Sequence, residues 1–136
     1  MRFFIFLVVV CMAATGCKKK IDAIKEDLLV KMILNSQWVV TKYMDGPVEK
    51  TADFSPYYFQ FRKDYTVDAF KDNAVTTTGT WSGNIDTKTI TSNFPNTNPI
   101  LQLLNGSWLI TDSDLSYVQA TQTVNGQERF LRLVKK

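Results

Sequence analysis

Residues 57–69 read YYFQFRKDYTVDA, the clearest β-hairpin pattern in this 136-residue chain. Side chains of a strand alternate between its two faces, so Tyr57, Phe59 and Phe61 fall on one apolar face. Lys63 and Asp64 then predict a tight turn. After the turn, the apolar face continues at Tyr65, Val67 and Ala69. The stretch therefore predicts two paired antiparallel strands with one buried face.

The same strand-like pattern of residues extends over most of the chain. Threonine, valine and aromatic residues form short runs separated by turn residues, which is typical of antiparallel strands. The expected strands are 38–44, 56–62, 65–71, 75–82, 87–93, 107–111, 115–123 and 127–134. Asn125-Gly126 predicts a hairpin between the last two. Eight consecutive strands can close and so remove exposed sheet edges. We therefore expect a mainly β fold, an eight-stranded up-and-down antiparallel β-barrel with a short N-terminal helix.

Two segments depart from the strand pattern. Residues 21–34 place apolar side chains at helical spacing, which predicts a helix that packs on the barrel. In residues 98–106, Asn98 suits a helix N-cap and Pro99 suits the first helical position. We expect a short helix there, with a ninth strand as the alternative.

The link lengths distinguish the two ends of the expected barrel. Successive links of an up-and-down barrel alternate between its ends, so the two longest, 45–55 and 94–106, share one end. The opposite end has tight turns and receives the N-terminal helix. We therefore expect one looped end, through which a ligand would enter, and one plugged end.

The N-terminus has the features of an export signal. Arg2 precedes twelve apolar residues, 3–14, which as a helix span about 18 Å. The hydrocarbon core of a bilayer is about 30 Å thick, so this run fits the apolar region of a signal peptide. The string Ala14-Thr15-Gly16-Cys17 follows it. An ordinary secretory signal that ends in cysteine is the alternative.

This string resembles the lipobox of bacterial lipoproteins. The resemblance implies cleavage before Cys17 and lipidation of its sulfur, which would make the membrane a partner through this anchor. No aspartate follows Cys17, which in that family favours the outer membrane, on its periplasmic or its surface face. The expected organisation is a signal peptide at 1–16, a lipid-anchored tether and helix at 17–34, and the barrel domain at 35–136.

The barrel region resembles the lipocalin-like domains of small Bacteroidetes-type lipoproteins. The resemblance is carried by a helix that ends before Trp38 and by three stretches, Phe59–Val67, Thr78–Ser82 and Trp108–Ile110. It implies that the tryptophan of the first strand, Trp38, is covered by an arginine of the last strand. Arg129 and Arg132 are the candidates, and we expect Arg132 to be the partner.

The sequence lacks the residues that several classes of function require. The chain has no histidine, which excludes histidine-based triads and most zinc sites. Asp112 and Asp114 lie in a predicted turn, where aspartate bonds the backbone. The sequence shows no phosphate loop, nucleophile elbow or metal-ligand cluster. The formal net charge of +3 is too small to indicate a protein that binds nucleic acid. We therefore expect no enzyme activity, no cofactor, no metal and no nucleic-acid partner.

Two functions remain. The first is a membrane-anchored lipoprotein whose barrel binds a small apolar or ring-bearing ligand. Its candidate binding residues lie on or beside the two long links and are Phe54, Tyr57, Phe94, Leu101 and Leu104. The second is a structural or adaptor lipoprotein with a filled barrel that binds a partner protein. An apolar cavity would favour the first, and a filled barrel with an exposed apolar patch would favour the second.

Overall fold

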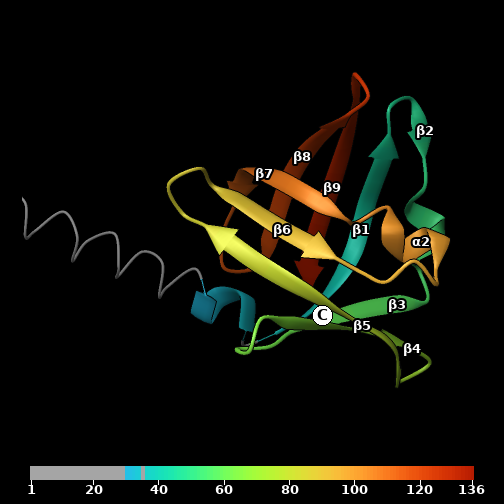
Figure 1. Cartoon of the computed structure of the whole chain (residues 1–136), viewed down its shortest axis with the longest axis vertical. Coiled ribbons are helices and arrows are strands. Elements are labelled where there is room, and N and C mark those ends of the chain that lie inside the picture. The colour runs from blue at the N-terminus through green and yellow to red at the C-terminus, as the bar shows by residue number, and fades with distance from the viewer. Residues whose placement is uncertain (1–29, 35) are drawn as a thin grey trace, which may run out of the picture.

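Eight antiparallel strands close into a barrel in the computed structural model, which describes residues 30–34 and 36–136 (Figure 1). Each strand pairs with its neighbour in the chain, and the last strand pairs back onto the first from Trp38–Lys135 to Asp45–Arg129. This confirms the predicted barrel. The strands are β1 (Gln37–Asp45), β3 (Tyr57–Phe61), β4 (Thr66–Lys71), β5 (Ala74–Asn84), β6 (Thr89–Asn93), β7 (Gly106–Ser113), β8 (Tyr117–Val124) and β9 (Gln127–Lys135).

The two long links contain short elements of their own. The first holds β2 (Val48–Glu49), which pairs with the end of β1, and the 3-10 helix η1 (Thr51–Phe54). The second holds α2 (Pro99–Gln102), whose N-cap Asn98 accepts hydrogen bonds from the backbone N–H groups of Ile100 and Leu101. The predicted short helix is therefore confirmed over the alternative strand.

Residues 30–34 are helical, and they form the described part of the helix expected over 21–34. The rest of that helix, the signal peptide and Cys17 lie outside the described residues. Within the part of the chain that the structure describes, no helix is long and apolar enough to cross a membrane.

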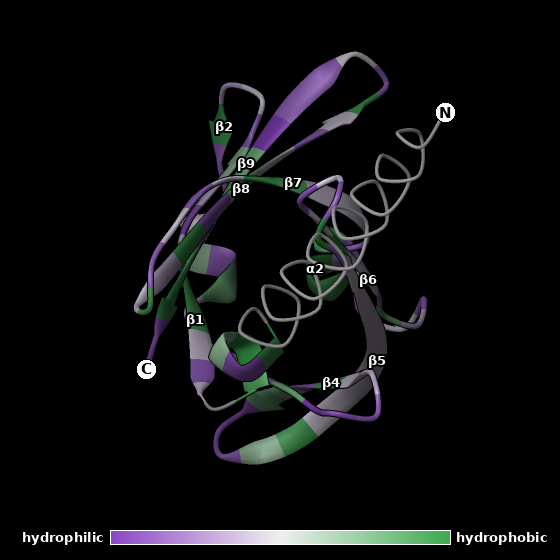
Figure 2. Cartoon of the chain, turned by 90° about the vertical axis from the view of Figure 1, so that its left-hand side faces the viewer, coloured by the Kyte–Doolittle hydropathy of each residue, from purple (hydrophilic) through white to green (hydrophobic). Residues whose placement is uncertain are grey.

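The two ends of the barrel differ in what covers them. The Tyr43 ring stacks on Phe54 of η1, and its hydroxyl donates to the Leu103 carbonyl after α2, so both long links lie at one end as predicted. At the other end, the Trp38 indole N–H donates to the Ile33 carbonyl, 3.1 Å away. Figure 1 shows residues 30–34 and α2 on opposite sides of the barrel, and Figure 2 shows the ring of strands from the side of residues 30–34.

One prediction about the first hairpin is wrong. Tyr65 was expected on the buried face, but it is 56% exposed and precedes β4 with a φ of 65°. The Asp64 carboxylate accepts hydrogen bonds from the backbone N–H of Thr66 at 3.1 Å and from its hydroxyl at 2.6 Å. This local bonding extends the turn through Tyr65, because aspartate side chains favour turns of this kind. The strand starts one residue later than predicted.

The expected contact between Trp38 and Arg132 is also wrong. The Lys135 ammonium lies 5.8 Å from the Trp38 ring centroid, whereas the Arg132 guanidinium lies 5.0 Å from that of Tyr117. Leu131 and Leu133 point into the barrel, so Arg132 between them points outward. Lys135, directly opposite Trp38 in the strand register, is the residue that the alternation places on the same side.

We expect Trp38→Ala to lower the free energy of unfolding by about 3–5 kcal/mol, because the side chain is only 1% exposed and fills the end of the core. Trp38→Phe keeps a ring but loses the bond to Ile33, so its loss should be smaller. Urea unfolding measures both. Leu109→Ala, on the outer face and 47% exposed, is the control. A Trp38→Ala loss no greater than this control would contradict the packing described.

Candidate functional site

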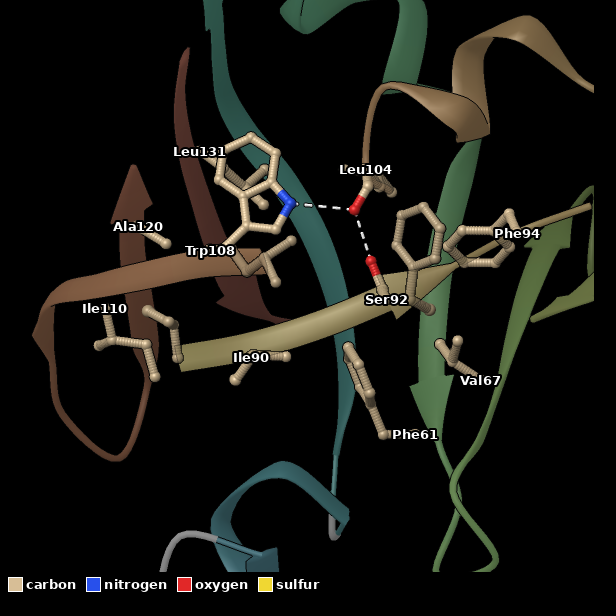
Figure 3. Close-up of a pocket in the computed structure, with 13 residues that line it drawn as sticks. Phe61, Val67, Ile90, Ser92, Phe94, Leu104, Trp108, Ile110, Ala120 and Leu131 are labelled. Carbon is tan, nitrogen blue, oxygen red and sulfur yellow. Dashed lines mark hydrogen bonds between the residues drawn. The ribbon is translucent and has the colours of Figure 1, made fainter. Parts of the chain in front are cut away.

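An apolar cavity of about 60 Å³ lies inside the barrel (Figure 3). A water molecule needs roughly 10–15 Å³, so the cavity has room for about four to six groups of that size. Ser92 is the single polar residue among the described residues that line the cavity. The lining consists of Phe59, Phe61, Val67, Ile90, Ser92, Phe94, Leu104, Trp108, Ile110, Val118, Ala120, Leu131 and Leu133.

The carbonyl group of Leu104 closes the cavity toward α2. Its oxygen accepts hydrogen bonds from the Trp108 indole N–H, at 2.9 Å, and from the Ser92 hydroxyl (Figure 3). Both donors are lining residues whose polar groups would otherwise lack a partner inside an apolar space. The same two bonds therefore satisfy the polar groups of the lining and hold the link after α2 against β6 and β7.

Asn105 fixes the two ends of the 94–105 segment to each other. Its side-chain oxygen accepts from the Phe94 backbone N–H at 2.6 Å, and its side-chain nitrogen donates to the Phe94 carbonyl at 3.1 Å. The Phe94 ring is 3% exposed and packs edge-on against Phe59, with the ring centroids 6.1 Å apart. The segment is therefore a fixed closure of this end.

Two tyrosines tie the same segment to other strands. The Tyr43 hydroxyl of β1 donates to the Leu103 carbonyl at 2.6 Å, and the Asn98 side-chain amide donates to the Tyr57 hydroxyl of β3 at 2.9 Å. Tyr43 is fully buried, and its burial raises the pKa of the hydroxyl to about 12. The hydroxyl thus stays protonated and keeps its donor role over the whole physiological range.

The predicted binding residues separate into two groups. Phe94 and Leu104 line the cavity. Phe54, Tyr57 and Leu101 lie outside its lining and are buried beside it, with exposed fractions of 0%, 6% and 0%. The looped end expected to admit a ligand is therefore closed by the residues proposed to bind one. The reason is that the long links carry apolar side chains and internal hydrogen bonds that pack onto the barrel end.

The partly exposed apolar lining residues lie toward the opposite end. They are Phe61, Ile90, Ile110 and Leu133, at the ends of their strands nearest residues 30–34. Their side chains face the cavity, and Ile33 of the adjoining helical segment is buried in the same core at 3% exposure. The sequence analysis missed Ile90 and Ile110, although their alternation with Ser92 and Trp108 places them on the inner face.

Several acidic side chains of the described residues take part in local bonds. The Asp68 carboxylate bonds to Arg62 at 2.7 Å and accepts from the Thr78 hydroxyl at 2.7 Å. The hydrogen bond from Arg129 lowers the pKa of the Asp45 carboxyl. Asp114 accepts from the Ser116 backbone N–H, a turn role that matches the prediction. Among residues 30–34 and 36–136, no group of three cysteine, aspartate or glutamate side chains could hold a metal ion.

Comparisons with known proteins bear on the fold alone. No protein-family model matches this chain, and no curated protein sequence matches it. The solved structure of a DUF4847 family protein from Bacteroides vulgatus is similar, with a TM-score of 0.55 and 15% sequence identity. The alignment covers 79% of this chain and 97% of that one. This likeness supports the barrel architecture.

We expect the closed end to weaken in alkali. The folded state holds the Tyr43 proton up to a pKa of about 12, whereas the unfolded state releases it near the ordinary value of 10.0. The contribution of the Tyr43 hydroxyl to the free energy of unfolding is therefore fully present below pH 10. It falls by at most roughly 2–3 kcal/mol as the pH rises from 10 to 12.

Tyr43→Phe is the matched variant, because it keeps the ring and removes the titrating hydroxyl. It should be less stable than wild type by about 0.5–1.5 kcal/mol at pH 8. Between pH 10 and pH 12 wild type alone loses the Tyr43 contribution, so the difference should fall to zero and then reverse, leaving the variant the more stable protein near pH 12. Urea unfolding at several pH values measures the difference. A difference that does not change across this range would show that the Tyr43 proton is not held by the fold.

Proposed function

We propose that this chain is a lipid-anchored protein of the bacterial outer membrane whose barrel binds a small apolar molecule. The observation that carries the proposal is the chemistry of the cavity. Twelve of its thirteen lining residues are apolar, and the Ser92 hydroxyl already donates to the Leu104 carbonyl. Binding in such a cavity is driven mainly by the removal of apolar ligand surface from water, which contributes roughly 25 cal/mol per Å² to the free energy of binding.

The lining defines the class of ligand. A charged group buried there without a partner would carry a large desolvation cost, so the bound part is uncharged. Four of the lining side chains are aromatic and the remaining apolar ones are aliphatic, which suits a ring or a short alkyl chain. Pockets for drug-sized ligands span about 300–1,000 Å³. The smaller cavity here favours a small molecule, or one end of a longer molecule that continues past Ile110.

The sequence supports the anchor and the location. Ala14-Thr15-Gly16-Cys17 follows a short apolar run that fits a signal peptide, and lipidation of Cys17 would attach the mature chain to the outer membrane. The proposed activity is binding, because the polar groups of the lining residues Ser92 and Trp108 are engaged in hydrogen bonds that hold the fold.

A second candidate is the adaptor function, favoured by one patch on the outer face. The rings of Tyr58 and Phe70 stack across β3 and β4, with centroids 4.7 Å apart. Val75 of β5 lies opposite Phe70 in the register and is 50% exposed. A partner protein that covers this patch would bury apolar surface outside the barrel and leave the cavity unused.

We expect Ala120→Leu to abolish ligand binding. Ala120 is 4% exposed and faces the cavity, so a leucine there would occupy the space of a ligand. The full-length lipoprotein is purified from bacterial membranes in detergent, and native mass spectrometry detects the bound molecule before and after incubation with indole and 1-octanol. Wild type should carry added mass that Ala120→Leu lacks.

Thr121→Leu is the matched control, because the neighbouring side chain adds similar bulk on the outer face. It should retain the added mass. Urea unfolding checks that the Ala120→Leu variant remains folded, since overpacking costs typically about 1–3 kcal/mol. The binding proposal fails if wild type carries no added mass with either probe, or if both leucine variants retain it equally.

A further inference from the structure

The barrel end beside residues 30–34 carries two protruding apolar side chains. Tyr65, 56% exposed, lies in the turn between β3 and β4, and Leu115, 77% exposed, lies in the turn between β7 and β8. Both turns are at the end where the partly exposed lining residues of the cavity lie. The strand order places the two turns on opposite sides of the barrel ring, so the pair flanks this end.

The backbone holds Tyr65 in its exposed position. Its φ of 65° is uncommon for a residue other than glycine, and it turns the side chain away from the strand. The Tyr65 N–H donates to the Arg62 carbonyl at 3.1 Å, and the Tyr65 carbonyl accepts from the Trp81 N–H at 2.9 Å. The ring leans on Trp81, with centroids 5.5 Å apart. The turn therefore holds the Tyr65 ring in a fixed, exposed position.

The turn that carries Leu115 is also fixed. The Asp114 carboxylate accepts from the Ser116 N–H at 2.6 Å and from the Tyr117 N–H at 3.1 Å, which defines the backbone on either side of Leu115. Turns of this kind usually expose polar residues. Leu115, which is 77% exposed, contributes little to the core, and its side chain is available to contact another apolar phase.

The path of the chain indicates which apolar phase that is. Thirteen residue steps separate Cys17 from Val30, and as the helix predicted from Ile21 most of them would advance only about 1.5 Å each, roughly 20 Å in all. Residue 30 enters the barrel at the end that carries Tyr65 and Leu115. The opposite end lies a further nine-residue strand away, about 30 Å. A lipid on Cys17 therefore brings the bilayer to the end of the barrel that carries Tyr65 and Leu115.

We propose that the end of the barrel marked by Tyr65 and Leu115 docks on the lipid bilayer, with the cavity opening toward the membrane. This inference rests on the lipid anchor of the proposed function. Tyrosine suits this position, because its ring is apolar and its hydroxyl remains in contact with water at a membrane interface. The ligand class then becomes an apolar molecule dissolved in the membrane, or the end of an acyl chain, that reaches the cavity without crossing water.

Site-specific fluorescence tests the orientation. Lipidation occupies Cys17 and cleavage removes Cys11, so a cysteine introduced at Leu115, Tyr65 or Val48 is the one free thiol of the mature chain. Each variant is labelled with an environment-sensitive dye. The full lipoprotein is then reconstituted into phosphatidylethanolamine–phosphatidylglycerol vesicles with and without brominated acyl chains. Leu115→Cys and Tyr65→Cys should be quenched at least about twofold more than Val48→Cys.

Val48→Cys is the matched control, because Val48 is also an exposed apolar residue, at 53%, but lies at the α2 end. Equal quenching at the three positions, or the strongest quenching at Val48, overturns the docking proposal. Cys17→Ser distinguishes the anchor from the docking. If wild type incorporates no more labelled fatty acid than Cys17→Ser does, the anchor is refuted, whereas quenching confined to Leu115 and Tyr65 still supports the docking surface.

Discussion

The carbonyl oxygen of Leu104 determines which end of this barrel is closed. It accepts hydrogen bonds from two side chains of the cavity wall, the Trp108 indole and the Ser92 hydroxyl. A polar group left unpaired in such a space costs about 1–3 kcal/mol, so these bonds are difficult to give up. Asn105 and Tyr43 reinforce the same segment through Phe94 and Leu103. The closed end and the apolar lining beside it follow from this arrangement.

The closure also explains how the barrel keeps an apolar space without collapsing. Strand pairing around the full ring fixes the wall, and the closure supplies the polar partners that the wall itself lacks. The remaining lining is apolar, and its partly exposed residues, Ile110 and Leu133 among them, lie toward the opposite end. Anchoring the chain at that end would place the opening beside the membrane, where molecules that fit an apolar lining are most concentrated. The closure and the proposed binding function would then use opposite ends of the same barrel.

Much of the fold could be predicted from local sequence chemistry. Alternation identified the strands, Asn98 and Pro99 identified α2, and Asn125-Gly126 adopts the left-handed conformations of the predicted hairpin turn. Arg132 was misassigned because it alternates with the inward-pointing Leu131 and Leu133 and so points outward, and because the register places Lys135 opposite Trp38. The candidate site was harder to predict. Whether an apolar residue on a link closes a barrel or lines its cavity depends on how the link packs, as the contrast between Phe54 and Phe94 shows.

Native-state hydrogen exchange tests most directly the claim that the α2 end is a fixed closure. The informative probe is the Phe94 backbone N–H, which donates to the Asn105 side chain, compared with the amides of the β8–β9 ladder. A fixed closure predicts that Phe94 exchanges only with global unfolding, at the same opening free energy as the ladder. Exchange of Phe94 through a local opening far below that free energy, while β8 and β9 stay protected, would show that the α2 end opens on its own and would contradict the account.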